Sequence, residues 1–189
     1  MACSFAIVSE RTAMTRSAFP FFLALAIGLS GPAQAGQAVA SASAPGVFVP
    51  DAAQAALVAK ARRAGATDIT TRPAPDGGMI VNGKLDGRIF VLAIPANWNR
   101  EVVLIGQGYA TPDSTPKVPE DPTAPSESGG VLRHIYGEGL AVGVAAFDKS
   151  GIATESGAKN AMRLHALTTR LGAKRHYAVG GSMGGSIVL

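Results

Sequence analysis

The segment that most constrains this chain lies near the end of the sequence and reads Gly180-Gly181-Ser182-Met183-Gly184, a G-x-S-x-G pattern. An apolar-rich run at 176–179 precedes it and a second one at 185–189 follows, the order typical of a strand, a tight turn and a helix start. Glycines at the flanking positions let strand and helix pass closely, because a Cβ there would keep them apart. The sequence therefore predicts that Ser182 stands on a sharp strand-to-helix turn.

Such a turn is suited to a nucleophile. The turn lifts the serine hydroxyl off the end of a sheet, and the N-terminal N–H groups of the new helix can stabilise developing negative charge. A Gly/Ser turn whose hydroxyl merely caps the helix is the alternative interpretation. A phosphate-binding loop is disfavoured, because no Gly-Lys-Ser/Thr follows and the glycines do not fall as G-x-G-x-x-G.

The first 35 residues predict an export signal. Arg11 and Arg16 precede an apolar stretch at 18–29, and Ala33-Gln34-Ala35 forms an A-x-A cleavage site; Met14 is an alternative start that leaves a shorter basic region. The apolar stretch is too short for a membrane span, which needs roughly 20 residues. We therefore expect a secreted or periplasmic protein with no stable membrane span after cleavage.

Composition narrows the function classes. The net charge of +4 becomes +3 after cleavage, with 15 basic and 12 acidic residues remaining. The basic residues are scattered without interleaved aromatic residues, so nucleic-acid binding is not expected. The single cysteine, Cys3, lies in the signal, which leaves no disulfide, thiol nucleophile or thiolate ligand in the mature chain. Neither a metal nor a cofactor is predicted.

The mature chain reads as a flexible linker at 36–50 and one domain from 51 onward. Two pairs, Asn82-Gly83 and Asp86-Gly87, signal a hairpin, and the five prolines of 111–128 mark a long loop of the kind that is often functional or mobile. Helices are predicted at 51–64, 129–138 and 155–171, and strands at 79–81, 88–94, 102–105, 141–147 and 176–179. This alternation predicts βαβ units and a parallel sheet covered on both faces.

From about Arg88 onward, several runs carry a family resemblance: Ile94-Pro95-Ala96-Asn97-Trp98-Asn99, then the apolar run 102–105, then Gly106-Gln107-Gly108-Tyr109, and finally Ser182-Met183-Gly184-Gly185. Together they resemble the α/β-hydrolase superfamily, particularly its secreted esterase-like and prolyl-oligopeptidase-like members. Family members often have His-Gly where this chain has Gln107-Gly108. Because a backbone donor does not depend on the side chain, we expect substitution of Gln107 to matter less than substitution of Ser182.

The resemblance implies a role for each matching residue. Ser182 becomes the nucleophile, the backbone N–H groups of Met183 and Tyr109 form the oxyanion hole, and Gly180 and Gly184 are the elbow glycines. It also implies an α/β-hydrolase-like fold, with a mostly parallel sheet, helices on both faces, and a sheet that is incomplete at the C-terminus.

The base that a serine nucleophile needs is not evident. In this family the acid and the histidine follow the serine, yet no acidic residue or histidine follows Ser182. His176 lies on the incoming strand, roughly 20 Å away at ~3.3 Å per residue. His134 and His165 fall in predicted helices as surface or satisfied residues, and Asp148 reads as a solvated turn carboxylate.

We therefore expect residues 51–189 to be the N-terminal part of a hydrolase domain that is inactive by itself. The expected activity is that of an exported serine hydrolase acting on small-molecule carboxylic esters, with peptide bonds as second choice. The alternative is a non-catalytic exported binding module on the same frame.

Overall fold

The computed structural model describes residues 48–188, which contain a six-stranded sheet in the order β1-β2-β3-β5-β4-β6. The predicted export signal at 1–35 and most of the predicted linker at 36–50 lie outside the described residues. Within the described part of the chain, no helix has both the length and the apolar character needed to cross a membrane.

The elements of this region follow one another with short turns and one long loop. The strands are β1 (Thr67–Pro73), β2 (Met79–Leu85), β3 (Arg88–Ile94), β4 (Glu101–Gly106), β5 (Ala141–Ala145) and β6 (Arg175–Gly180). The helices are α1 (Ala52–Arg63), α2 (Val131–Gly137), α3 (Thr154–Leu171) and α4 (Met183–Val188), with 3-10 turns η1 (Pro75–Gly77) and η2 (Ser128–Gly130).

The prediction of a mostly parallel, α/β-hydrolase-like sheet is wrong, because the sheet is mixed. β1–β2, β2–β3 and β3–β5 pair antiparallel, and only β4–β5 and β4–β6 pair parallel. The reason lies in the connections. β2 and β3 are joined by the two-residue turn Asp86-Gly87, in which both residues have positive φ (47° and 76°), and such a short turn allows only antiparallel pairing. Parallel pairing needs crossovers as long as those that contain α2 and α3.

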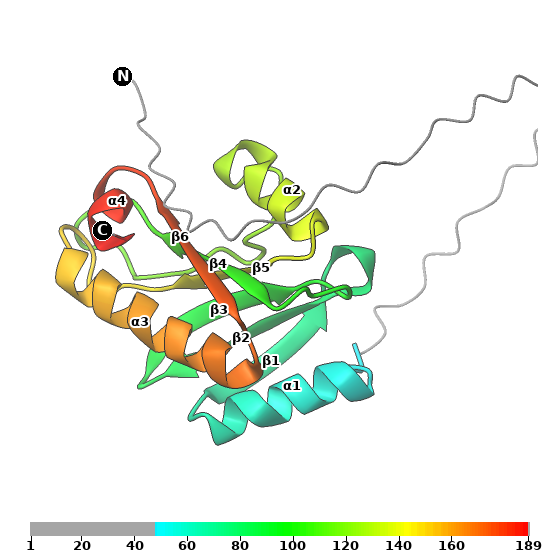
Figure 1. Cartoon of the computed structure of the whole chain (residues 1–189). Coiled ribbons are helices and arrows are strands. Elements are labelled where there is room, and N and C mark those ends of the chain that lie inside the picture. The colour runs from blue at the N-terminus through cyan, green and yellow to red at the C-terminus, as the bar shows by residue number, and fades with distance from the viewer. Residues whose placement is uncertain (1–47, 189) are drawn as a thin grey trace, which may run out of the picture. The chain divides into compact units, whose positions relative to one another are not determined.

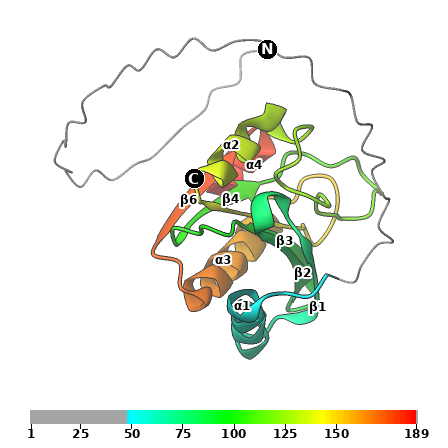
Figure 2. The same ribbon diagram turned by 90° about the vertical axis from the view of Figure 1, so that its right-hand side faces the viewer.

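Helices cover both faces of the sheet (Figure 1). α1 and α3 pack on one face, where Val58, Leu164 and Leu167 contact side chains of the inner strands. α2 packs on the other face, where Leu132 and Tyr136 meet Val91 and its neighbours. The view in Figure 2 shows the sheet between α2 and the α1/α3 pair. The central strands are therefore buried on both sides.

Local sequence signals account for the helix ends. The Asp51 carboxylate accepts a hydrogen bond from Gln54 N at 2.8 Å, and the Gln54 side chain accepts one from Asp51 N, which forms a capping box at the start of α1. Gly172 ends α3 in a left-handed conformation (φ 114°), which only glycine adopts without strain. The start of α1 and the end of α3 therefore lie where the sequence predicts them.

Candidate active site at the turn between β6 and α4

Ser182 stands between the last strand and the last helix of the described region. β6 ends at Gly180 and α4 begins at Met183, so the predicted strand, turn and helix start are present. The Ser182 backbone is left-handed, with φ of 55°, and the side chain is exposed. A non-glycine residue in this region costs of order 1–3 kcal/mol and persists only where the surrounding structure enforces it.

Three glycines, Gly106, Gly180 and Gly184, make this turn possible. Because they have no side chain, the backbones of β4, β6 and α4 come into direct contact. A Cβ at Gly180 would lie less than 3.0 Å from the Gly184 carbonyl, and a Cβ at Gly184 would lie as close to the Gly106 carbonyl. Real Cβ atoms essentially never approach backbone so closely. β6, α4 and the end of β4 are therefore packed main chain against main chain around Ser182. Gly180 and Gly184 were expected at this turn, whereas Gly106 was expected only as the first residue of the loop after the apolar run 102–105.

The Ser182 hydroxyl is not used to cap α4. The N–H groups of the first turn bond to backbone oxygens instead, Gly184 N to Gly181 O at 2.9 Å and Gly185 N to Ser182 O at 3.0 Å. Within residues 48–188 the hydroxyl makes no hydrogen bond, and a capping serine would have extended rather than left-handed backbone. The helix-cap alternative therefore does not describe this residue.

The loop after β4 lies directly against this turn. A Cβ at Gly184 would lie 2.9 Å from the Gln107 carbonyl, and one at Gly108 would lie 3.9 Å from the Gly181 carbonyl. The structure thus brings together the two segments that the sequence assigned to one site, although they are far apart along the chain.

The two predicted oxyanion donors lie on these adjoining segments. Met183 opens α4, and Tyr109 follows Gly108 with its side chain 56% exposed. Neither backbone N–H has a hydrogen-bond acceptor within the described region.

A cavity of about 510 Å³ opens beside the loop and the turn. Its wall includes Ile105, Val144 and Val179, from the C-terminal ends of the three parallel strands. Such ends are where open α/β sheets bind ligands. The remaining lining residues come from the loops and α2: Gly106, Gln107, Gly108, Pro119, Pro122, Glu127, Ser128, Val131, Leu132, Ile135, Gly180 and Gly181. The proline-rich loop 111–128 thus supplies part of the wall, and the wall is mostly apolar.

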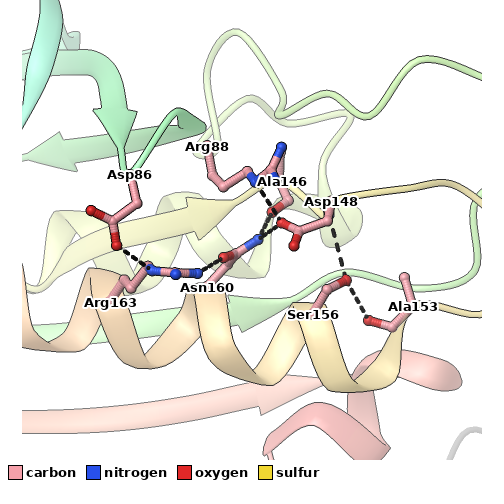
Figure 3. Close-up of polar contacts among 8 residues, drawn as sticks. All are labelled: Asp86, Arg88, Ala146, Asp148, Ala153, Ser156, Asn160 and Arg163. Atoms are coloured by element: carbon pink, nitrogen blue, oxygen red, sulfur yellow. Dashed lines mark hydrogen bonds and ion pairs between the residues drawn. The ribbon is translucent and has the colours of Figure 1, made fainter.

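Asp148 lies in an exposed bend after β5, as the sequence suggested, and its carboxylate also bonds to other side chains. It lies 2.8 Å from Arg88 Nε and accepts a hydrogen bond of 2.8 Å from Asn160 Nδ2 (Figure 3). Asn160 is 2% exposed and also donates to the Ala146 carbonyl at 2.8 Å. The carboxylate therefore belongs to a network that fixes the connection between β5 and α3.

This connection contacts the candidate site through Met183. Ala153 N donates to the Met183 sulfur over 3.5 Å, and Ile187 of α4 packs with Phe147 and Ala153. The start of α4 is thus held by the segment that the Asp148 network fixes.

None of the three histidines is hydrogen-bonded to Ser182. His134 lies on α2, whereas the rings of His165 on α3 and His176 on β6 are in contact, with centroids 3.9 Å apart and planes tilted by 39°. His176 Nε2 lies 2.9 Å from Thr168 Oγ1. Burial, with a smaller contribution from His165, lowers the pKa of His176 below its usual value. Residues 48–188 contain no group of three or more His, Cys, Asp or Glu that could hold a metal ion.

The side chain of Gln107 makes a contact that the sequence did not predict. Its Nε2 donates to the Ala145 carbonyl at the end of β5 over 2.9 Å. No local pattern indicates this bond, because it depends on β5 lying next to β4.

Comparison of the chain with protein-family models, with curated proteins and with solved structures gave no significant match.

Proposed function

We propose that this chain carries the nucleophile and the oxyanion loop of an exported serine hydrolase that acts on carboxylic esters, with peptide bonds as second choice. The proposed relationship to the α/β-hydrolase superfamily rests on the local motifs around Ser182 and Gln107, and a mostly parallel sheet is no part of it. The observation that carries the proposal is the left-handed backbone of Ser182 at the junction of β6 and α4.

The strain at Ser182 supports a role for its hydroxyl. A glycine at position 182 would adopt φ of 55° at no cost, whereas serine costs of order 1–3 kcal/mol. The hydroxyl offsets none of this cost through a hydrogen bond within residues 48–188. A strained, exposed serine at the start of a helix suits attack on a substrate carbonyl.

The cavity beside the turn supports an ester with an apolar acyl or leaving group. Its volume of about 510 Å³ is in the range of small-molecule sites, roughly 300–1,000 Å³. Its aliphatic lining would bury such a group, and the charged Glu127 in the same wall would disfavour an anionic one. These features favour esters of apolar acids over charged substrates.

The proposed reaction is acyl transfer. The Ser182 oxygen attacks the carbonyl carbon, its proton passes to a general base, and the carbonyl oxygen becomes an oxyanion held by the N–H groups of Met183 and Tyr109. The leaving alcohol takes a proton as its bond to the acyl carbon breaks. Water then attacks the acyl-enzyme, which releases the acid and restores the hydroxyl.

The reaction requires a base and a partner that orients it. Residues 48–188 place no histidine or carboxylate in hydrogen-bond contact with Ser182, and Asp148 is already bonded to Arg88 and Asn160. The test therefore uses the protein translated from the complete reading frame, including any residues beyond Leu189.

A fluorophosphonate probe tests the nucleophile. The wild-type protein is expected to label at Ser182, as located by peptide mass spectrometry, and Ser182→Ala is expected to abolish labelling. Ser186→Ala is the matched control, because Ser186 is also exposed and lies one helical turn further along α4. Labelling that survives Ser182→Ala would contradict the assignment. A well-folded protein that neither labels nor hydrolyses p-nitrophenyl acetate would favour the non-catalytic binding module.

A further inference from the structure

We infer that Gln107 is a positioning residue for the oxyanion hole and acts through its side-chain amide, an inference that rests on the proposed function. The sequence alone suggested little importance for this side chain, since only neighbouring backbone was assigned a role. Its contacts in the folded chain give it one.

The Gln107 amide extends the connection between β4 and β5 beyond the end of their backbone ladder. The last backbone pair of these parallel strands is Ile105 with Val144. One step further along, Gln107 Nε2 donates to the Ala145 carbonyl over 2.9 Å. The side chain therefore replaces the next backbone bond and holds the start of the loop against β5.

On its other side, the same residue touches the turn that carries Ser182. Gly184 lies so near that a Cβ there would be 2.9 Å from the Gln107 carbonyl. The main chain of Gln107 is thus fixed between β5, through its amide, and α4, through van der Waals contact. A shift of this residue would change the distance between the loop and the nucleophile.

A second anchor holds the far end of the loop. Gly151 N donates to the Ala110 carbonyl over 2.9 Å, and the two residues form an isolated bridge. Tyr109 lies between the two anchors, and its N–H has no acceptor within the described region. The direction of this proposed donor is therefore set by two bonds, of which only the Gln107 bond comes from a side chain.

Gln107→Met tests this inference in the protein from the complete reading frame, with p-nitrophenyl acetate as substrate. Methionine has a similar length and no donor. Loss of a whole oxyanion donor typically lowers turnover about 10²–10³-fold, so a donor that is only misdirected should lower kcat roughly 10- to 100-fold. KM should stay within about twofold, and the inhibition constant of phenylboronic acid, which places an anionic oxygen in the hole, should rise with the loss in kcat.

Gln54→Met is the matched control, because Gln54 also donates its side-chain amide to a backbone carbonyl, that of Gly77, in a different part of the fold. It should leave kcat and boronic acid inhibition unchanged. Wild-type kcat in Gln107→Met, with hydrolysis still dependent on Ser182, would overturn the inference and leave the proposed function standing. A fall in kcat that follows the folded fraction, with unchanged boronic acid inhibition, would also overturn it. Hydrolysis that does not depend on Ser182 would overturn both.

Discussion

Gly184 lies where the backbones of α4 and β4 touch, and the neighbouring Gly185 does not. A Cβ at position 184 would meet the Gly106 carbonyl at less than 3.0 Å, whereas one at position 185 would find its nearest neighbour, the Gly180 carbonyl, at 3.5 Å. The two glycines are adjacent in sequence and share a helix, so they separate the effect of close packing from that of helix propensity.

Gly184→Ala should lower the free energy of unfolding by about 2–3 kcal/mol, because α4 must move away from β4 to admit the methyl group. Gly185→Ala should be neutral or raise it by up to about 1 kcal/mol, since alanine is the better helix former and the space is sufficient. Urea unfolding of both variants measures the difference. Equal stabilities would show that the close approach of α4 and β4 is not a constraint.

His176 gives the fold a pH dependence. Burial, together with nearby His165, lowers its pKa from the usual 6.5, so the unfolded chain binds a proton more readily than the folded one. The free energy of unfolding should therefore fall as the pH drops below about 6.5 and through the lowered folded pKa. The groups facing the ring are His165 and Thr168, both on α3.

His176→Gln should flatten this dependence, because glutamine can keep a hydrogen bond to Thr168 and does not titrate. Thermal melts between pH 8 and pH 5 measure it, with His134→Gln on α2 as the control that should keep the wild-type slope. An unchanged slope in His176→Gln would exclude His176 as its source.

At the scale of elements, Asn160 ties α3 to the end of β5. Its amide donates to the Ala146 carbonyl and to Asp148, and its oxygen accepts from Arg163 at 2.6 Å. Asn160→Leu would leave the buried Ala146 carbonyl without this partner, whereas the exposed Asp148 carboxylate would keep its ion pair with Arg88. One unsatisfied buried group costs about 1–3 kcal/mol, so we expect a loss in that range in chemical denaturation.

Lys84→Gln is the comparison for this prediction. The Lys84–Asp68 ion pair joins β2 to β1, and both side chains are well exposed (43% and 64%), so its loss should cost less than about 1 kcal/mol. If Asn160→Leu proved as mild as Lys84→Gln, the network in Figure 3 would not be what holds the β5–α3 connection.

The elements that the sequence predicted well are those with strong local signals. α1 has its Asp51 cap, α3 its apolar face and Gly172, and β4 its continuous apolar run. β1 was missed because Thr67–Pro73 is polar, mostly exposed and interrupted by the left-handed Asp68 (φ 51°). β2 continues through Asn82-Gly83, which had been read as part of the turn, because its pairing with β3 outweighs the local turn preference.

The site could be predicted in part for the same reason. The turn around Ser182 is local, so its strand, helix start and two glycines could be read from adjacent residues. The strand order could not be predicted from adjacent residues, because long-range packing places β5 between β3 and β4. The Gln107–Ala145 bond and the Gly106 contact follow from that order and from the β4–β6 pairing.

At the scale of the whole molecule, export remains a prediction, since residues 1–35 lie outside the described region. The A-x-A site predicts that the exported protein begins at Gly36, because signal peptidase cleaves after such small residues. Intact-mass measurement of secreted or periplasmic material decides this. A mass that retains the apolar stretch 18–29 would mean a membrane anchor in place of a signal.

The contact between Gly106, Gly180 and Gly184 also orders the events of folding. β4 and β6 are neighbours in the sheet, but α2, β5 and α3 lie between them in the chain, so their pairing closes a long loop and is intrinsically slow. The left-handed turn at Ser182 is held only when both strands and α4 are in place. Within residues 48–188, β6 is held in the sheet by its pairing with β4. The reactive geometry therefore forms late in folding, and it depends on a pairing between segments that are far apart along the chain.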